Sequence, residues 1–116
     1  MQIAPKAVEF KRVPIRSPRG LSFSKGQPCT LQFEGICNFD WETTVPAHIH
    51  DETFGRGQKA DDTSTVDACH ACHTSLDQRT HGLDDATLYW TLLRALIRTT
   101  RRRALDGSLA YFVRKA

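Results

Sequence analysis

The stretch Cys69-His70-Ala71-Cys72-His73 carries two thiols and two imidazoles in five residues, the densest group of metal-binding side chains in the sequence. A Cys-x-x-Cys spacing allows two thiolates to reach one tetrahedral ion from a tight turn. If that turn runs into a helix, His73 can be directed toward a second ion. The sequence therefore predicts two ion sites that share this stretch, one closed and structural, the other open and reactive.

The size and composition of the chain indicate a single domain. With 116 residues, 40% of them hydrophobic, it is long enough for a modest core and too apolar to be disordered. No apolar run approaches the ~20 residues that cross a bilayer, and no apolar segment typical of a signal peptide follows Met1. We therefore expect a cytoplasmic protein, in which four cysteines are metal ligands rather than two disulfides.

The net charge of +3 conceals a strong partition along the chain. Residues 1–27 hold six basic residues against one acidic residue, and residues 94–116 hold seven against one. Residues 28–93 hold eleven acidic residues against three basic ones. Cationic ends suit a polyanionic partner and an acidic middle suits bound cations, although solvated surface charge explains either end equally well.

Residues 1–27 are predicted to form a basic, mostly extended N-terminal arm that folds either onto the domain or onto a partner. Three prolines and two glycines interrupt any long regular element in this segment. The ordered domain is then expected to cover residues 28–116.

Two further cysteines complete a ligand set. Residues 30–33 alternate like a short strand and Glu34-Gly35 indicates a turn, so a hairpin could bring Cys29 and Cys37 to one ion. Four thiolates on one zinc ion leave no open coordination position, which makes the site structural. Such a site contributes on the order of 10 kcal/mol to folding. The alternative is a set of free thiols. The predicted zinc ligands are Cys29, Cys37, Cys69 and Cys72.

The pattern between these cysteines predicts strands that lead into a short helix. Residues 43–50 are rich in β-forming residues, with Pro46 limiting them to an edge strand. Residues 64–68 suit a second strand. A helix is expected from about residue 70 to residue 80, ended by Gly82 as its left-handed residue.

The longest helix is predicted to begin at Asp84-Asp85 and to end near Asp106-Gly107, with acidic groups at its positive N-terminus. One apolar stripe and one basic end follow from its periodicity. The stripe is Leu88, Leu92, Ala95 and Leu96, widened by Tyr89, Leu93 and Ile97. Together these elements predict an α+β fold.

All five histidines lie between residues 48 and 81. His48 ends a predicted strand, His73 follows the second thiol of the Cys-x-x-Cys pair, and His81 lies eight residues later, near the same side of the same predicted helix. A strand histidine that faces ligands on a helix suits phosphodiester hydrolysis, in which an imidazole takes a proton from water and a divalent ion polarises the phosphate. His50 and His70 are assigned no role.

These features occur in one ordered pattern: Cys29…Cys37, Val45-Pro46-Ala47-His48-Ile49, Asp62, Cys69-x-x-Cys72-His73 and Asp77-Gln78-Arg79-Thr80-His81. The pattern resembles the YbcO-like prophage proteins, a family of small nucleases related to the HNH, or ββα-metal, endonucleases. The resemblance covers residues 28–106. It implies a hairpin and a helix that grip one divalent ion, a separate zinc that fastens the fold, and a phage or prophage origin in a bacterial host cell.

The resemblance also implies roles for single residues. His48 takes the place of the general base, and Asp62 takes the place of the residue that orients it. His73 takes the place of the helix ligand to a catalytic Mg²⁺ or other divalent ion, with His81 or Asp77 as a second ligand. The implied activity is metal-dependent endonuclease cleavage of DNA.

Ala47 is a departure from that family pattern. Many HNH enzymes carry Asp or His directly before the base, as a metal ligand. With Ala47 in this position, the ion would rely on His73 together with His81, Asp77 or His50.

DNA, including branched or structured DNA, is the expected partner. Basic side chains near the end of the long helix and before the second strand are predicted to contact its phosphates. They are Arg98, Arg101, Arg102 and Arg103, with Arg56 and Lys59. A homodimer would suit double-strand cutting, but we find no exposed apolar heptad in the sequence that argues for one.

Three alternative functions fit parts of the pattern. A zinc-stabilised nucleic-acid-binding module without catalytic activity explains the cysteines and the basic ends. A zinc domain that binds another protein explains the cysteines alone. A c-type haem site fits Cys69-x-x-Cys72-His73, but it requires export and leaves Cys29 and Cys37 unexplained.

Overall fold

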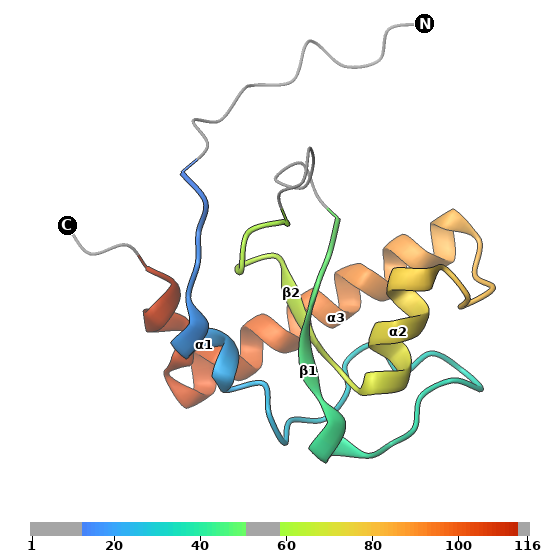
Figure 1. Ribbon diagram of the computed structural model, residues 1–116, viewed down its shortest axis with the longest axis horizontal. Coiled ribbons are helices and arrows are strands. Elements are labelled where there is room, and N and C mark those ends of the chain that lie inside the picture. The colour runs from blue at the N-terminus through green and yellow to red at the C-terminus, as the bar shows by residue number, and fades with distance from the viewer. Residues whose placement is uncertain (1–12, 51–58, 114–116) are drawn as a thin grey trace, which may run out of the picture.

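The computed structural model describes residues 13–50 and 59–113. Within these ranges a two-stranded hairpin packs against one long helix, and a shorter helix follows directly from the hairpin (Figure 1). This arrangement confirms the predicted α+β class with a long C-terminal helix. In chain order the elements are α1 (Pro18–Ser22), η1 (Trp41–Thr43), β1 (Val45–His48), β2 (Thr65–Ala68), α2 (His70–Gln78), α3 (Asp85–Asp106) and η2 (Ser108–Phe112).

The hairpin is antiparallel, with Val45 opposite Ala68 and His48 opposite Thr65. Both strands lie at an edge of the two-stranded sheet, so Pro46 is tolerated in β1. Every residue of β2 is buried, and α3 makes its main contact with this strand. The register therefore holds His48 at the end of β1 that opens into the connecting loop.

The core lies between the hairpin, α3 and the cysteine-bearing segments. Leucines along one side of α3 pack onto it, as the predicted stripe requires. The fully or nearly buried members are Cys29, Leu31, Phe33, Ala47, Val66, Ala68, Cys69, Cys72 and Ala95.

The long helix begins and ends where the sequence predicts. The Asp84 carboxylate accepts a hydrogen bond from the Thr87 N–H at 2.7 Å, which caps the first turn and holds the pKa of Asp84 below its usual value. Gly107 ends the helix in a left-handed conformation, with φ of 81°. In the part of the chain that the structure describes, no helix combines the length and the apolar character needed to cross a bilayer.

Two predictions of local structure are wrong. Helix α2 ends at Gln78 rather than near residue 80, because Arg79 adopts the left-handed conformation with φ of 57° and the Thr80 N–H bonds the Ser75 carbonyl. Residues 30–33 form no strand. The Thr30 N–H donates to the Asp67 carbonyl, and the positive φ of Gln32 then turns the chain.

The described part of the predicted arm, residues 13–27, is less extended than expected, and residues 1–12 lie outside the described residues. Residues 18–22 form helix α1, which packs against η2 (Figure 1). At Gly20 the two elements approach so closely that a Cβ atom would lie 2.5 Å from the Phe112 ring. The Arg19 guanidinium lies 4.5 Å from the centre of the Tyr111 ring. Residues 18–22 therefore pack onto the domain through η2.

Candidate metal centre and active-site groove

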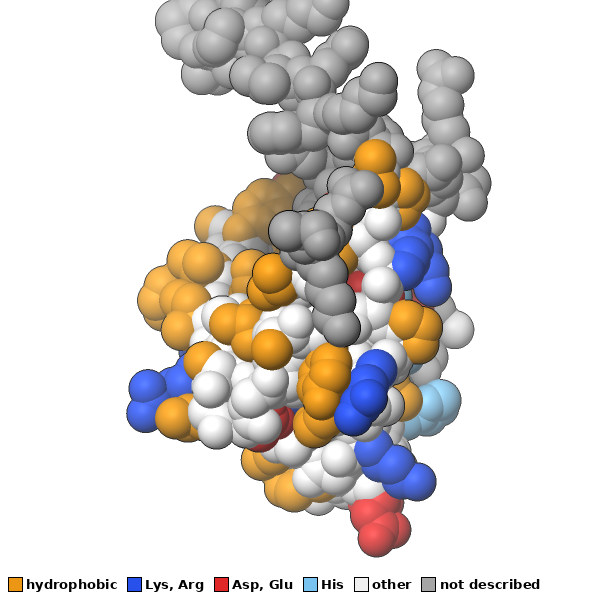
Figure 2. All heavy atoms as spheres, turned by 90° about the vertical axis from the view of Figure 1, so that its left-hand side faces the viewer, with side chains coloured by type: hydrophobic (Ala, Val, Ile, Leu, Met, Phe, Trp, Pro, Cys, Tyr) orange, Lys and Arg blue, Asp and Glu red, His pale blue; other side chains and the backbone are white. Residues whose placement is uncertain are grey.

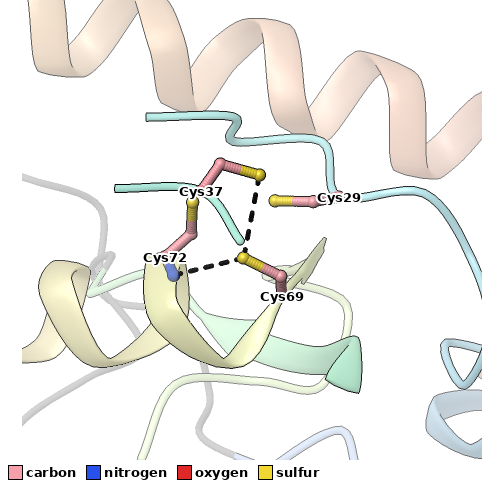
Figure 3. A group of neighbouring side chains, drawn as sticks. All are labelled: Cys29, Cys37, Cys69 and Cys72. Carbon is pink, nitrogen blue, oxygen red and sulfur yellow. Dashed lines mark hydrogen bonds between the residues drawn. The ribbon is translucent and has the colours of Figure 1, made fainter. Parts of the chain in front are cut away.

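The four cysteine sulfurs lie within 4.8 Å of one another and point toward a common centre (Figure 3). Cys69 caps α2 and accepts a hydrogen bond from the Cys72 N–H at 3.4 Å, so the start of the helix supplies two sulfurs. Cys29 and Cys37 reach the same point from the turn before η1. The predicted ligand set is thus brought together to hold a metal ion.

The spacing of these sulfurs fits a tetrahedral ion. Sulfurs that each lie about 2.3 Å from a tetrahedral zinc are separated from one another by about 3.8 Å. The Sγ atoms of Cys37 and Cys69 are 3.8 Å apart.

Electrostatics at the cluster favour a bound cation. A hydrogen bond from the Cys72 thiol lowers the pKa of Cys29 to about 5, and the same bond raises the pKa of Cys72 far above its usual value. Burial raises the pKa of Cys37 to about 11. Each thiolate opposes the ionisation of its neighbours, so a divalent ion is needed for all four to be ionised together.

A second polar arrangement lies at the other end of β1. His48 Nε2 is 2.9 Å from Asp62 Oδ1, and Asp62 is only 2% exposed. Its other oxygen, Oδ2, accepts a hydrogen bond from the Ser17 N–H at 2.7 Å. Because an ionised carboxylate only accepts hydrogen bonds, His48 donates through Nε2 and keeps a lone pair on Nδ1. The side chain of His48 is 21% exposed, so solvent reaches the imidazole that carries this lone pair.

His48 lines a groove of about 520 Å³ between the end of β1, the end of α2 and the start of α3. Three further side chains with basic groups face the same space. They are His81, Arg79 and His50. The sequence alone assigned no role to Arg79 and named His50 only as one alternative ligand of a catalytic ion. Arg79 lies inside the motif at residues 77–81. Its left-handed backbone conformation directs it to the groove, and an arginine in the sequence gives no sign of that conformation.

The predicted ligands of a catalytic ion lie in two places. His73 Nε2 is 3.1 Å from Asp77 Oδ2, one turn apart on α2, and neither is among the described residues that line the groove. His81 lies in the groove, where its ring packs 5.4 Å from that of Phe33 and its Nδ1 accepts the Leu83 N–H. We expected His81 to lie near His73 on the same side of one helix. Because α2 ends at Gln78, His81 lies outside the helix and this expectation is wrong.

Among the described residues, the only group of three or more Cys, His, Asp or Glu side chains close enough to share an ion is the cysteine cluster. Ala47, which precedes the candidate base, is completely buried and contributes no ligand.

The predicted phosphate contacts divide into exposed and internal residues. Arg98 and Arg101 are exposed and line a cleft of about 610 Å³ between α3 and the segment around Cys29. Lys59 is exposed, and Arg56 lies outside the described residues. Figure 2, which views the end of the molecule that carries α1 and η2, shows Lys and Arg at separate positions rather than in one patch on the visible surface.

Arg102 and Arg103 do not fit the prediction, because both turn inward. Arg102 forms two hydrogen bonds to the buried carboxylate of Asp67, at 2.7 and 3.0 Å. Arg103 is 2% exposed, donates to the Thr65 hydroxyl at 2.6 Å and stacks on the Phe112 ring. Arg102 is therefore held by an ion pair inside the fold, although it also lines the cleft with Arg98 and Arg101, whereas Arg103 is buried and burial lowers its pKa.

Comparison with known proteins places this arrangement in a family. A family model described as "Putative nuclease YbcO" matches residues 21–107, which include all four cysteines and the His48–Asp62 pair. The chain belongs to the YbcO family. The family resemblance seen in the sequence is therefore confirmed, whereas the relationship of the YbcO fold to HNH enzymes stays a prediction.

Two YbcO relatives match the chain to the same extent. They are "Putative nuclease YbcO" of Escherichia coli (strain K12) and "Putative nuclease ybcO" of Enterobacteria phage 82. Each is 36% identical over 77 residues, which cover 66% of this chain and 80% of the relative. A solved structure, described as that of a putative bacteriophage protein from E. coli str. K-12 substr. MG1655, has a TM-score of 0.58 and 30% identity, covering 73% of this chain and 95% of that one.

Proposed function

We propose that the chain is a metal-dependent endonuclease of the HNH type that hydrolyses phosphodiester bonds in DNA and is encoded by a phage or prophage. The observation that carries the proposal is the His48–Asp62 hydrogen bond at the wall of a groove that also holds Arg79. The names of the YbcO relatives, from E. coli and from a phage, support the same class of reaction.

The groove residues supply a route for the proton. His48 Nδ1 accepts a proton from a water molecule, whose oxygen forms a bond to the phosphorus while the bond to the leaving sugar oxygen breaks. The leaving oxygen takes a proton from solvent. Asp62 fixes the tautomer of His48 and stabilises the imidazolium that forms, and Arg79 offsets the charge of the phosphate.

Two metal sites belong to this proposal. The cysteine cluster holds a structural Zn²⁺, which its four-sulfur geometry suits. His73 and Asp77, which lie outside the residues that line the groove, would hold the second, hard ion only together with a phosphate of the bound substrate. When bound there, Mg²⁺ or another divalent ion supplies charge stabilisation to the phosphate and the leaving oxygen.

A second candidate is a zinc-stabilised nucleic-acid-binding module without catalytic activity. The observation that favours it is the scarcity of ligands for a reactive ion. Ala47 offers none, and His73 and Asp77 form only a pair in the described structure. In this alternative, exposed arginines such as Arg98 and Arg101 contact phosphates and His48 is structural.

Plasmid cleavage separates the two candidates. The wild-type protein and His48→Ala are incubated with supercoiled plasmid and Mg²⁺ or Mn²⁺, and the exposed His70→Ala serves as a histidine control away from the groove. We expect nicking by wild type and His70→Ala and its loss in His48→Ala, with DNA binding and zinc content retained in all three. Binding without cleavage by wild type would favour the module.

A further inference from the structure

The side of α3 that faces away from the core carries an apolar seam. Its six residues recur at alternating spacings of four and three, and all are exposed. The α3 seam is Ala86, Trp90, Leu93, Ile97, Thr100 and Ala104. Its three large members are 61%, 50% and 59% exposed, in the order Trp90, Leu93 and Ile97, and Tyr89 beside them is 64% exposed.

This spacing is that of a helix that packs against another helix. A repeat of four and three residues places its members along one line of an α-helix, as in the contact line of a coiled coil. The opposite side of α3 carries the buried residues Thr91, Ala95, Thr99 and Arg103. The heptad was not predicted from the sequence, in which Leu93 and Ile97 widen the core stripe, whereas both side chains are exposed in the structure.

We propose that the α3 seam binds the α3 seam of a second copy of this chain, with the two helices antiparallel. Charge decides both the partner and the direction. The first turn of α3 is acidic, with Asp84 and Asp85, whereas its second half presents the exposed Arg98 and Arg101. A parallel pair would set arginine against arginine, but an antiparallel pair sets the basic half against the acidic end and opposes the helix dipoles.

The antiparallel register matches large side chains with small ones. Trp90 lies opposite Thr100 of the partner subunit, Leu93 opposite Ile97 of the partner subunit, and Ala86 opposite Ala104 of the partner subunit. Each contact occurs twice about a two-fold axis, so the interface closes and no further copies are added.

The dimensions of the seam suit a specific contact. At 1.5 Å per residue the line from Ala86 to Ala104 is roughly 27 Å long. Specific interfaces cover about 800 Å² on each partner, and a Trp or Tyr side chain alone supplies about 150–250 Å². Trp90, with the two aliphatic members of the seam, therefore provides the apolar centre of such an interface, whereas Tyr89 beside it also lines the groove that holds His48.

Molar mass in solution tests the proposal. Across a roughly hundredfold range of concentration, the wild-type chain is expected to approach twice the 13.1 kDa monomer mass by light scattering or sedimentation. Leu93→Glu should remain monomeric with unchanged zinc content and circular dichroism. Leu105→Glu, a change at a more exposed leucine on another side of the same helix, should dimerise like wild type. A wild-type chain that stays monomeric throughout, or equal dimerisation of both variants, would overturn the proposal.

Crosslinking tests the direction. In the double variant Ala86→Cys, Ala104→Cys, an antiparallel pair forms disulfides between residue 86 of one chain and residue 104 of the other, located by mass spectrometry of digested dimer. Neither single variant should crosslink through its new thiol. Crosslinks between two copies of residue 86 would show a parallel pair and contradict the proposed register.

Discussion

At the scale of single residues, Asp62 is fixed from several sides. One oxygen lies 2.9 Å from His48 Nε2, and the other accepts the Ser17 N–H. The Asp62 N–H donates to the Ile15 carbonyl, so the N-terminal segment also holds the backbone at this point. The position of the candidate base is therefore set by residues 15–17, far away in sequence.

Asp62→Asn tests whether the carboxylate orients His48 and stabilises its protonated form. The amide keeps the size of the side chain but removes the negative charge that stabilises the imidazolium. We expect plasmid cleavage to fall about a hundredfold or more, with DNA affinity nearly unchanged. Asp61→Asn is the matched control, because the Asp61 carboxylate accepts the Ile15 N–H rather than bonding the base. Equal loss in both variants, measured as initial nicking rates, would argue against an orienting role.

Neighbouring arginines of α3 differ in what their charges do. The side chain of Arg102 is 14% exposed and pairs with an Asp67 carboxylate that is 1% exposed. Burial alone would lower the pKa of Arg102, but the hydrogen bonds and charge of Asp67 outweigh it and raise that pKa. Arg101 is exposed beside it. Two consecutive arginines of the helix therefore differ, since Arg102 is paired inside the fold and Arg101 lies on the surface.

Arg102→Gln should lower the free energy of unfolding by about 3–5 kcal/mol, because it leaves the buried Asp67 charge unpaired. Arg101→Gln should leave stability within about 0.5 kcal/mol of wild type and weaken DNA binding evenly across sequences, with a salt slope reduced by about 1. Urea unfolding and salt-dependent binding measure the two effects. A stable Arg102→Gln protein would show that the pair contributes little.

At the scale of elements, the backbone conformation at the end of α2 decides which side chains line the groove. Arg79 is exposed and left-handed, and the chain turns there so that His81 leaves the helix and lies with His48. A left-handed conformation costs a side chain with a Cβ about 1–2 kcal/mol. The strain at Arg79 is consistent with a residue that is kept for its charge rather than for its conformation.

Arg79→Gly is expected to raise the free energy of unfolding by about 1 kcal/mol, since glycine adopts the left-handed conformation freely. The same change removes the cation from the groove, so DNA affinity and cleavage should fall. Gln78→Gly, in the last turn of α2, should instead lower stability by about 1 kcal/mol and spare DNA binding. Unchanged cleavage in Arg79→Gly would remove this arginine from the proposed site.

At the scale of the whole molecule, the cysteine cluster joins segments that secondary structure does not connect. Cys29 and Cys37 belong to irregular chain, whereas Cys69 and Cys72 begin α2. The described hairpin is only four residues long on each side, which is too short to be stable alone. A metal ion held by the four sulfurs would therefore add to the cooperativity of the domain, together with the packing of the hairpin on α3.

Removal of the metal should unfold the domain. We expect one zinc per chain and, with a strong chelator, loss of helical circular dichroism and reaction of all four thiols with an alkylating reagent, since the site contributes on the order of 10 kcal/mol. Cys37→Ser should bind zinc more weakly while the other three ligands remain. A purified chain that contains no metal and keeps its helices would contradict the structural role of the cluster.

Local patterns in the sequence determined the hairpin, the long helix and the cysteine cluster. The acidic cap and final glycine of α3, the β-forming residues of the hairpin and the Cys-x-x-Cys pair are short-range signals, and each was predicted correctly. Such signals depend on the capping, periodicity and ligand chemistry of neighbouring residues, which a sequence displays directly. The family resemblance rested on the same ordered residues.

Only the tertiary structure decided which side chains face one another. The left-handed turn at Arg79 places His81 in the groove with His48 rather than beside His73 on α2. The ion pair of Arg102 with Asp67 and the burial of Arg103 direct two predicted DNA contacts into the fold. The two faces of α3 were likewise separated only by packing. Periodicity shows that a helix has sides, but which side is covered depends on contacts between residues far apart in the chain.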